Sequence, residues 1–366
     1  MIDVAFAIPG DIDAPTGGYA YARRLLHHLP GHGVTAHHIA LPGSFPDPTE
    51  QDLEVTKHLL AQIDPATPIL FDGLAFGALP PEILAAIASP VVALVHHALA
   101  LETGLTSQQR RYFQASERVA LQHATAVIAS SPLTARTLVR DYAVDPDLIS
   151  IAEPGTVPAL RAIGTGRPFT MLAVGAVIPR KGYPVLIDAL QVLATELDAA
   201  PDDWHLTIVG ATGHAPEEAN LLRERVLQSG LRRNITIAGE VSARELSRLY
   251  VHADLFVMPS LYEGYGMVLA EAMARGLPIV STTGGAAAET VPDDAALKVP
   301  PGDAAALADA IRTAMVDDDR RKAMADASWE AGRRLPDWPD SAAIVASVLK
   351  SVAAGERTGG HQSERA

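Results

Sequence analysis

Cysteine is absent from the 366 residues of this chain. Its absence excludes disulfides, thiolate nucleophiles and thiolate metal sites, and it fits a reducing compartment such as the cytoplasm. No apolar stretch approaches the roughly 20 residues of a membrane span, so we expect no membrane span. Residues 1–6 include Asp3 and no basic side chain, which favours a first strand over a signal peptide. We therefore expect a cytoplasmic protein.

Basic charge is also scarce. The chain carries 29 lysine and arginine residues against 43 aspartate and glutamate residues, a formal net charge of −14. A nucleic-acid partner would need a basic surface that neutralises phosphates, so we expect none. The same deficit weighs against strong docking on anionic lipid. Apolar residues make up 48% of the chain, which is enough for sizeable cores, and the length favours two domains.

Short apolar segments alternate with helical patterns along both halves of the chain. In the first half, strands are expected at Val4–Pro9, Thr35–Leu41, Ile69–Phe71, Val91–His97, Thr125–Ser130 and Leu148–Ala152, and helices at Tyr19–Leu29, Thr49–Ile63, Ser107–His123 and Pro132–Asp141. In the second half, strands are expected at Thr170–Val174, His205–Val209, Ile235–Ala238, Leu255–Met258, Pro278–Ser281 and Leu297–Val299, and helices at Tyr183–Leu197 and Glu217–Gln228. This alternation predicts parallel sheets built from βαβ units, with ligands bound beyond the carboxyl ends of the strands.

The alternation is interrupted once near the middle of the chain. The segment Ala159–Pro168 contains two glycines and a proline close together, and we interpret it as an interdomain linker. The domains are therefore expected at residues 1–160 and 168–338.

The end of the chain follows a different pattern. Helices are expected at 303–315 and 317–333, followed by a break at Leu335–Pro339 and a last helix at 340–354. Residues 355–366 are polar and are expected to be disordered.

The residues from Leu255 to Glu289 organise the second half. The apolar strand Leu255–Met258 leads into a loop that contains Gly264 and Gly266, and a helix is expected from Met267 to Arg275. This order places a glycine-lined helix start at the carboxyl end of a sheet. Free backbone N–H groups and the helix dipole bind anions at such a place.

Two carboxylates flank this helix start. Glu263 precedes the glycines, and Glu271 lies within the helix. An ionised carboxylate accepts strong hydrogen bonds from the hydroxyls of a diol, such as those of a sugar or a ribose. Phosphate binding beside diol binding indicates a nucleotide sugar.

The spacing from Glu263 to Glu271 resembles the E-x7-E motif of the retaining family 4 glycosyltransferases, which have the GT-B fold. Further residues match that family's donor site: Ala272, Met273, Ala274, Gly276, Pro278, Gly285 and Glu289. The resemblance implies an α/β protein of GT-B architecture, with two doubly wound Rossmann-like domains and an interdomain cleft. It also implies that the last helix packs back on the first domain, after a tryptophan near the position of Trp338; a plain core or surface tryptophan is the alternative.

The activity implied by the resemblance is transfer of a sugar, with retention, from a nucleoside-diphosphate sugar that carries uridine or guanosine. The acceptor is then a hydroxyl of a small-molecule, lipid-linked or glycan acceptor, and neither a cofactor nor a metal ion takes part. Glu263 is expected to bond the hydroxyls of the transferred sugar, and Glu271 those of the ribose. Further donor contacts are expected from Gly264, Tyr265, Gly266, Met267 and Val268. Because no positioned carboxylate nucleophile emerges from the sequence, same-face attack with the leaving phosphate as base is favoured by analogy with the family.

A second glycine-bounded loop, Gly175–Gly182, follows the first strand of the second half. Its Arg180 and Lys181 are suited to neutralise the negative charge that grows on a leaving diphosphate. The loop is similar to the family's phosphate-binding loop, in which an arginine and a lysine hold the diphosphate. Lys181 matches, whereas Ala176 stands at the usual arginine position, and Arg180 is the candidate replacement. The alternative is a basic turn on the surface.

Two candidates lie in the first half. Gly17 and Gly18 open the first helix, where the family has a glycine loop that reaches the donor phosphates. His96 aligns with a family histidine that faces the donor sugar; a structural histidine is the alternative. Adjacent residues of a strand point to opposite faces, so His97 would point away from the same ligand, which argues against a metal site. The candidate catalytic residues are thus Glu263, Lys181, Arg180 and His96.

Three other functions stay open at this point. A nucleotide-sugar epimerase or hydrolase would share the fold, and a non-catalytic nucleotide-sugar-binding protein would share the donor site. The segment Val209–Gly213 resembles the glycine-rich turn of dinucleotide-binding reductases, but Pro216 occupies the place of the third glycine. A Rossmann oxidoreductase is therefore the third alternative.

Overall fold

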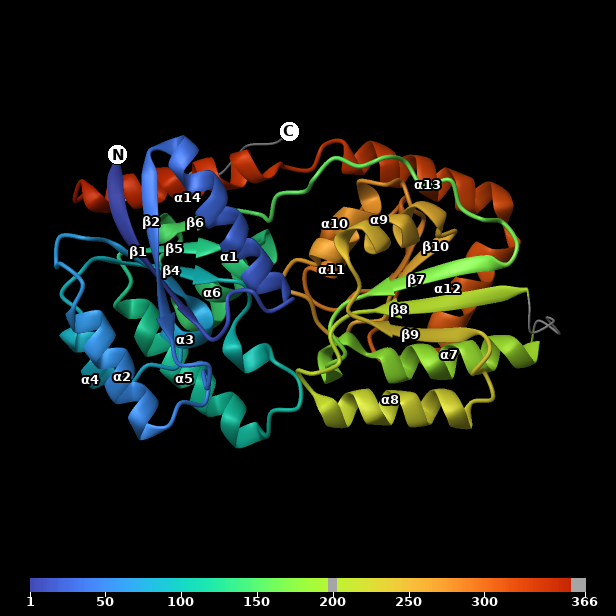
Figure 1. Cartoon of the computed structure of the whole chain (residues 1–366), viewed down its shortest axis with the longest axis horizontal. Coiled ribbons are helices and arrows are strands. Elements are labelled where there is room, and N and C mark those ends of the chain that lie inside the picture. Colours follow the sequence, from blue (N-terminus) through green and yellow to red (C-terminus); the bar gives the residue numbers. More distant parts are fainter. Residues whose placement is uncertain (197–202, 357–366) are drawn as a thin grey trace. The chain divides into compact units, whose positions relative to one another are not determined.

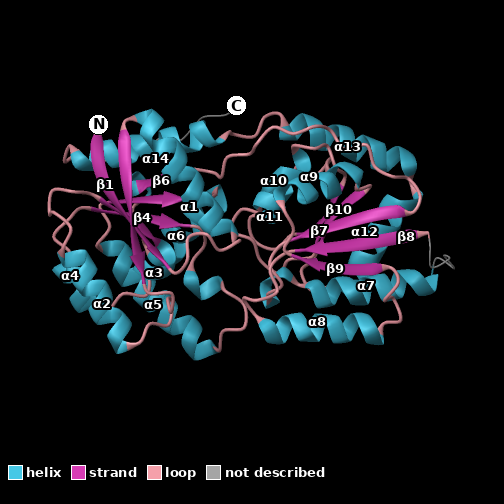
Figure 2. Ribbon diagram, viewed as in Figure 1, coloured by secondary structure: helices cyan, strands magenta, loops and turns pink. Residues whose placement is uncertain are grey.

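A computed structural model of the chain describes residues 1–196 and 203–356. The chain divides into two compact units. The first unit is Met1–Gly155 together with the chain from Pro336 onward, and the second unit is Thr156–Leu335. In each of them a parallel sheet is packed between helices (Figures 1 and 2).

The sheet of the first unit has the strand order β2-β1-β3-β4-β5-β6, and every neighbouring pair is parallel. Its strands are β1 (Ile2–Pro9), β2 (Val34–Leu41), β3 (Ile69–Asp72), β4 (Val91–Val95), β5 (Ala126–Ala129) and β6 (Ile149–Ile151). All six strands were predicted, but β4 ends two residues before the predicted His97. His96 and His97 therefore lie in the loop after the strand, where the alternation of a strand does not apply.

The helices of the first unit surround this sheet. They are α1 (Gly17–His28), α2 (Glu50–Ala61), α3 (Gly73–Phe76), α4 (Pro81–Ala86), α5 (Ser107–Gln122), α6 (Pro132–Tyr142) and α14 (Trp338–Ala353), with 3₁₀ turns η1 (Leu29–His32), η2 (Leu99–Leu101) and η3 (Pro146–Leu148). Local signals fix several helix starts. Thr49 and Thr106 form capping boxes with Asp52 and Gln109, which satisfy the N–H groups at the starts of α2 and α5.

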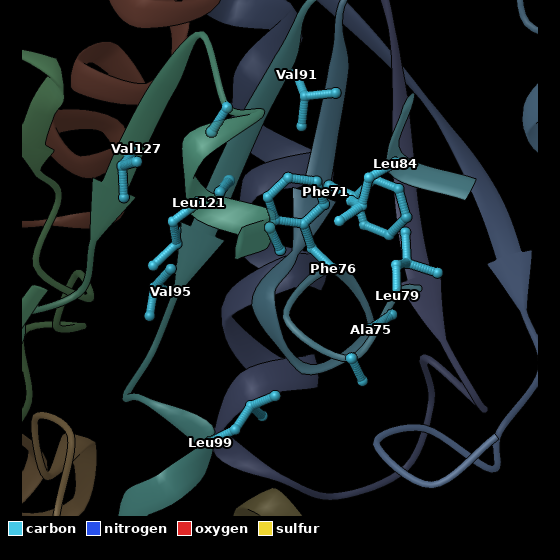
Figure 3. Packing of buried hydrophobic residues seen from close by; sticks show 14 of the residues in the cluster. Phe71, Ala75, Phe76, Leu79, Leu84, Val91, Val95, Leu99, Leu121 and Val127 are labelled. Atoms are coloured by element: carbon cyan, nitrogen blue, oxygen red, sulfur yellow. The ribbon is translucent and has the colours of Figure 1, made fainter. Parts of the chain in front are cut away.

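The core of the first unit lies on the central strands. Every residue of β3, β4 and β5 is buried. Phe71 of β3 and Phe76 of α3 bring their ring centroids within 5.2 Å of each other, inside the cluster of Figure 3. Because helices cover both faces of a parallel sheet, these strands are continuously apolar instead of alternating.

The last helix begins earlier than predicted. The predicted break at Leu335–Pro339 includes the first two residues of α14, since Asp337 caps the helix by accepting a hydrogen bond from the N–H of Asp340 at 2.9 Å. Pro339 is tolerated because a helix's first turn has no intrahelical acceptor for its N–H groups.

The side chain of Trp338 is buried against Tyr21 of α1, with ring centroids 5.6 Å apart. A Cβ at Gly155 would lie 2.3 Å from the backbone nitrogen of Trp338, so glycine is needed at this junction.

The sheet of the second unit has the order β12-β11-β10-β7-β8-β9 and is also parallel. Its strands are β7 (Phe169–Val174), β8 (Trp204–Val209), β9 (Ile235–Gly239), β10 (Leu255–Met258), β11 (Ile279–Thr282) and β12 (Ala296–Val299). Its helices are α7 (Tyr183–Glu196), α8 (Pro216–Gln228), α9 (Ala243–His252), α10 (Met267–Met273), α11 (Ala287–Thr290), α12 (Ala304–Val316) and α13 (Asp318–Gly332), with the 3₁₀ turn η4 (Pro179–Lys181). The predicted end of α7 at Leu197 lies outside the described residues, as does most of the predicted disordered tail at 355–366.

The predicted linker, 159–168, is anchored to the second unit. The N–H groups of Thr165 and Gly166 both donate to Oδ1 of Asp254 at 3.0 Å, and the N–H of Thr170 donates to its Oδ2 at 2.8 Å. The carboxylate of Asp254, between α9 and β10, thus accepts hydrogen bonds from two backbone N–H groups of the linker and from one of β7. The expected domain limits at 160 and 168 differ accordingly from the observed division after Gly155.

Within the described residues, none of the helices combines the length and the apolar character needed to span a membrane.

Candidate functional site

Two loops meet at the carboxyl edge of the second sheet. One follows β7 and the other follows β10, and these strands are direct neighbours. Gly182 has a left-handed backbone (φ +64°), and a Cβ there would lie 2.2 Å from the carbonyl oxygen of Pro259. The N–H of Leu261 donates to the carbonyl of Arg180 at 2.8 Å. A glycine at position 182 therefore allows the basic loop to approach the loop after β10.

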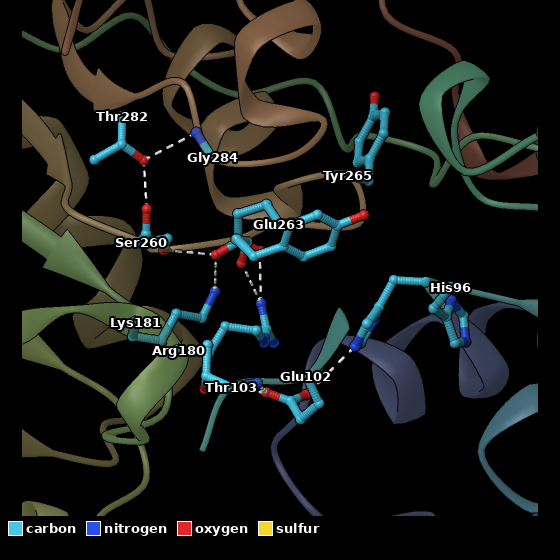
Figure 4. Close-up of polar contacts among 12 residues, drawn as sticks. His96, Glu102, Thr103, Arg180, Lys181, Ser260, Glu263, Tyr265, Thr282 and Gly284 are labelled. Carbon is cyan, nitrogen blue, oxygen red and sulfur yellow. Dashed lines mark hydrogen bonds and ion pairs between the residues drawn. The ribbon is translucent and has the colours of Figure 1, made fainter. Parts of the chain in front are cut away.

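Glu263 is the centre of this contact (Figure 4). Its side chain is buried, with 7% exposed. Oε1 accepts hydrogen bonds from Nζ of Lys181 at 2.5 Å and from Oγ of Ser260 at 2.6 Å, and Oε2 accepts one from Arg180 at 3.4 Å. Burial opposes ionisation of this carboxyl. The positive charges of Lys181 and Arg180 and the hydrogen bonds outweigh that cost and lower the pKa of Glu263 to about 2.

Arg180 and Lys181 are held inside the site. Their side chains are only 14% and 13% exposed, and Arg180 also donates to the carbonyl of Tyr262 at 2.8 Å. The alternative of a basic surface turn is therefore wrong for both residues. Two cations face one carboxylate here, so the cluster keeps an excess of positive charge that suits an anionic ligand.

The backbone of Glu263 is fixed by a second glycine pair. Its N–H donates to the carbonyl of Gly284 at 3.1 Å, and its carbonyl accepts from the N–H of Ala286 at 2.8 Å. Gly285 has φ +66°, and a Cβ there would lie 2.3 Å from the carbonyl oxygen of Glu263. The predicted match at Gly285 thus has a physical reason, namely close backbone approach.

The predicted donor-binding residues form the continuous segment between Glu263 and α10. Gly266 precedes the helix with a left-handed backbone (φ +92°). The N–H groups of Met267 and Val268 lie in the first turn of α10, where the helix itself supplies no acceptor for them. Tyr265 is buried, and its carbonyl accepts a hydrogen bond from Oγ1 of Thr290 at 2.6 Å. Gly264 completes the segment.

Glu271 is bonded to a tyrosine that the sequence analysis did not single out. Its Oε2 accepts a hydrogen bond from the hydroxyl of Tyr250 at 2.9 Å. Arg275 donates to the backbone carbonyl of Glu271 at 2.9 Å, and its guanidinium lies 4.4 Å from the centroid of the Tyr250 ring. Burial, followed by the charge of Glu271, raises the pKa of Tyr250, which therefore stays protonated and acts as a donor. Tyr250 belongs to α9, a helix that was not predicted; its capping residue Ser242 was the available signal.

In the first unit, the structure brings the predicted glycine loop and His96 together. Thr16 caps α1, which begins at Gly17, and a Cβ at Gly18 would lie 3.5 Å from Cδ2 of His96. The loop itself is held by Arg23, which donates to the backbone carbonyls of Ile12 and, at 3.2 Å, of Ala14.

His96 lies beside a buried carboxylate that the sequence analysis missed. Its Nε2 is 3.8 Å from Oδ2 of Asp72, the last residue of β3. Burial, and to a lesser degree the neighbouring His97, lowers the pKa of His96 to about 4. His97 instead lies 3.3 Å from Oε2 of Glu102 in the same loop. An acidic residue at the carboxyl end of a predicted strand was the signal for Asp72, because such ends converge at one edge of a parallel sheet.

Among the described residues, no group of three or more His, Asp or Glu side chains is placed to hold a metal ion. The whole chain lacks cysteine.

Residues 162–330 match the family model described as "Glycosyl transferases group 1". Relatives with assigned functions include a D-inositol 3-phosphate glycosyltransferase of Xylanimonas cellulosilytica, which is 30% identical over 61% of this chain and 56% of its own length. A mannosylfructose-phosphate synthase of Agrobacterium fabrum is 34% identical over 43% of this chain and 38% of its own length. The chain thus spans about half the length of the curated relatives it matches. Within the second unit, residues 162–330 form a domain of the glycosyl transferases group 1 type.

Solved structures with the same fold cover nearly the whole chain. A sucrose-phosphate synthase from Thermosynechococcus elongatus superposes with a TM-score of 0.80 and 20% identity, covering 97% of this chain and 100% of that one. Anabaena HepE in complex with UDP and glucose gives a TM-score of 0.72 and 18% identity, over 96% of this chain and 100% of that one. The predicted fold class, α/β with two Rossmann-like sheets in the GT-B architecture, is confirmed.

Proposed function

We propose that this protein is a retaining glycosyltransferase of family 4 type that moves a sugar from a nucleoside-diphosphate sugar to a hydroxyl acceptor. One observation carries the proposal: the buried carboxylate of Glu263 is held by Lys181 and Arg180 within a domain that matches glycosyl transferases group 1. The names of the relatives and the UDP bound to HepE support a nucleotide-sugar donor.

Arg180 and Lys181 would bind the diphosphate. Negative charge grows on this group as it leaves, and fixed cations in a buried site stabilise it without the reorganisation that water needs. Backbone N–H groups at Gly264–Val268 would add hydrogen bonds to the same phosphates. Glu271 would bond the ribose hydroxyls, and the hydrogen bond from the Tyr250 hydroxyl would hold its carboxylate in place.

Glu263 has room for one more hydrogen bond. An ionised carboxylate offers about four lone-pair sites, and Lys181, Ser260 and Arg180 occupy three of them. A hydroxyl of the transferred sugar would take the remaining site. Because Lys181 and Arg180 hold its pKa near 2, Glu263 is ionised at neutral pH and is a poor general base.

The analogy with the family, together with the three hydrogen bonds that already occupy the carboxylate of Glu263, favours same-face attack. In this step the bond between the anomeric carbon and the phosphate oxygen breaks, and a bond to the acceptor oxygen forms on the same face. The acceptor proton passes to the leaving phosphate. Small-molecule, lipid-linked and glycan acceptors all fit this step, and the relatives' names make inositol phosphate and sugar phosphates the first acceptors to test.

The proposal includes metal independence, since side-chain cations fill the role that a divalent ion would otherwise have. It also includes the absence of a cofactor and a cytoplasmic location. Turnover should survive excess chelator. Loss of turnover on chelation, with recovery on adding Mg²⁺ or Mn²⁺, would contradict metal independence while leaving the transferase proposal intact.

A thermal-shift screen with UDP, GDP and their hexose conjugates tests the donor, followed by product analysis with and without acceptor. Stabilisation by one nucleoside diphosphate and an acceptor-dependent product are expected. A sugar product formed without acceptor would indicate an epimerase or a hydrolase. Binding without any product would indicate a non-catalytic binding protein. Stabilisation by nicotinamide dinucleotides alone would indicate an oxidoreductase.

A further inference from the structure

Asp72 and His96 form a polar pair inside the first unit. The Asp72 side chain is 7% exposed, and its Oδ2 lies 3.8 Å from Nε2 of His96. Nε2 is buried and has no hydrogen-bond partner among residues 1–196 and 203–356. The rest of the imidazole is reachable, because 25% of the His96 side chain is exposed. One edge of the ring thus faces a carboxylate, and another part faces solvent.

The local fold holds Asp72 in this place. Its Oδ1 accepts a hydrogen bond from the N–H of Leu74 at 2.9 Å and so caps α3, which leaves Oδ2 for the imidazole. Gly73 begins α3, and a Cβ there would lie 2.9 Å from the carbonyl oxygen of Leu94 in β4. Glycine at position 73 therefore lets the start of α3 approach the strand that leads to His96.

His96 is fixed as well. Its carbonyl accepts hydrogen bonds from Oγ of Ser130 at 2.9 Å and from Oγ1 of Thr134 at 3.2 Å. Its ring packs edge-on against Tyr21, with centroids 5.2 Å apart. Both members of the pair are thus oriented by neighbours before any ligand binds.

We propose that Asp72 is a positioning residue for His96, which keeps the imidazole proton on Nε2 and so presents Nδ1 as an acceptor for a substrate hydroxyl. A carboxylate attracts an N–H and repels a lone pair, so it selects this tautomer. A hydroxyl of the substrate would then donate a hydrogen bond to Nδ1. This inference rests on the proposed function for its substrate, but the tautomer is a property of the protein alone.

The ionisation states of the pair support this arrangement. Burial raises the pKa of Asp72 to about 6, although the hydrogen bond from Leu74 opposes the shift, and burial lowers the pKa of His96 to about 4. At neutral pH the pair is therefore a carboxylate beside a neutral imidazole that carries one proton. A neutral imidazole can accept a hydrogen bond from a hydroxyl, whereas an imidazolium cannot.

Imidazole ¹⁵N NMR of the full chain near pH 7.5 measures the tautomer directly. Signals of His96 are identified by their loss in His96→Gln. The wild type should show a protonated Nε2 and an unprotonated Nδ1. Asp72→Asn preserves the shape and the cap of α3 but places an amide donor beside Nε2, so the proton should move to Nδ1. A wild-type His96 that carries its proton on Nδ1 would overturn the proposal.

Turnover provides the second measurement. Asp72→Asn should lower kcat about tenfold, the upper end of what one neutral hydrogen bond contributes. Asp145→Asn is the matched control, since Asp145 caps η3 through the same type of hydrogen bond, to the N–H of Asp147 at 3.0 Å, and is exposed. It should change kcat less than twofold.

The double variant separates positioning from structure. In a His96→Ala background, Asp72→Asn should cause no further loss, because Asp72 acts only through His96. An equal tenfold loss in that background would overturn the proposal. If the wild type transfers no sugar at all, the proposed function fails, and the NMR measurement still decides the role of Asp72.

Discussion

A buried carboxylate has a lowered pKa in the second unit and a raised pKa in the first. In the second unit, Lys181 and Arg180 outweigh the burial of Glu263 and lower its pKa to about 2. Among the described residues of the first unit, no cation contributes to the pKa of Asp72, and burial raises it to about 6. Burial alone therefore does not decide the charge of a site; the supply of countercharge does. The second unit is prepared for an anion, and the first presents a neutral imidazole suited to a hydroxyl.

The largest effect is expected from removing the cations of the second unit. Lys181→Ala and Arg180→Ala should each lower kcat roughly 10²–10³-fold, comparable with losing one oxyanion donor. Because Ala176 supplies no charge, these two are the cations of the loop. The double variant should lose less than the product of the single losses, since both act on one phosphate group. Turnover at saturating donor is the measurement.

A matched control for the cations is Arg225→Ala. Arg225 of α8 also pairs with a carboxylate, Asp188, but its side chain is 48% exposed. An exposed pair of this kind contributes little, so kcat should change less than twofold. A silent Arg180→Ala beside a damaging Lys181→Ala would show that Arg180 does not replace the arginine expected at position 176.

The next effect concerns the carboxylate itself. Glu263→Gln should lower kcat at least roughly tenfold while the fold persists, since one hydrogen bond to a charged group contributes about 1.5–3 kcal/mol. With its pKa near 2, Glu263 stays ionised at every pH above about 4, so the pH–rate profile should show no step from this group.

Glu245→Gln is the control for Glu263→Gln. Glu245 also pairs with an arginine, Arg248, at 2.7 Å, but on the open surface of α9. The kcat of Glu245→Gln should equal that of the wild type. Unchanged kinetics in Glu263→Gln would remove Glu263 from the site and leave it as a structural partner of the cations.

A smaller effect should come from the loop of the first unit. Arg23 holds the backbone carbonyls of Ile12 and Ala14 just before the predicted phosphate-binding glycines. Arg23→Ala should therefore raise the donor KM about fivefold, because a loop without these hydrogen bonds loses more conformational entropy when the donor binds. The neighbouring Arg24→Ala is the control, since Arg24 is exposed and lies over the ring of Trp338, 5.9 Å from its centroid. Equal KM values for the two variants would contradict the role of Arg23.

Long periodic segments were predictable from the sequence, and short ones were not. The observed α5, Ser107–Gln122, differs by one residue from its prediction, because its capping box and apolar spacing are local signals. The helices α3 and α4 have four and six residues, too few for a helical period to show. The start of α14 was placed wrongly because Pro339 was interpreted as a break instead of a first-turn proline.

The candidate site was predictable where a motif concentrates its residues. Glu263, Gly266 and Glu271 stand within nine residues of one another, so the glycine-lined helix start and the resemblance to a family motif indicated them together. Asp72 and Tyr250 were missed because their partners are distant in the sequence. Asp72 meets His96 only through the register of β3 and β4, in which Asp72 pairs with Leu94, and such a register is set by the whole sheet.

The smallest effect on turnover, and a distinct effect on stability, is expected at a third buried carboxylate. Glu117 of α5 is 1% exposed and accepts a hydrogen bond from the N–H of Leu99 at 2.9 Å, just beyond His96. Burial raises its pKa to about 8, although the hydrogen bonds from Leu99 and Tyr142 oppose the shift. Like Asp72, it has no cation among the causes that set its pKa, so it extends the comparison between the units.

Glu117→Gln should therefore flatten the pH dependence of stability. Between about pH 5 and pH 8 the unfolded chain ionises Glu117 while the folded chain keeps it protonated, so the wild type loses up to about 1.4 kcal/mol of unfolding free energy per pH unit from this group. Glutamine keeps an acceptor for Leu99 and does not titrate, whereas the exposed Glu82→Gln control should retain the wild-type slope. Denaturant unfolding at pH 5, 6.5 and 8 measures the difference. If the unfolding free energies of the wild type and Glu117→Gln changed equally with pH, the pKa of Glu117 would not be raised. Nearby charge would then offset the effect of burial in the first unit, as it does for Glu263 in the second.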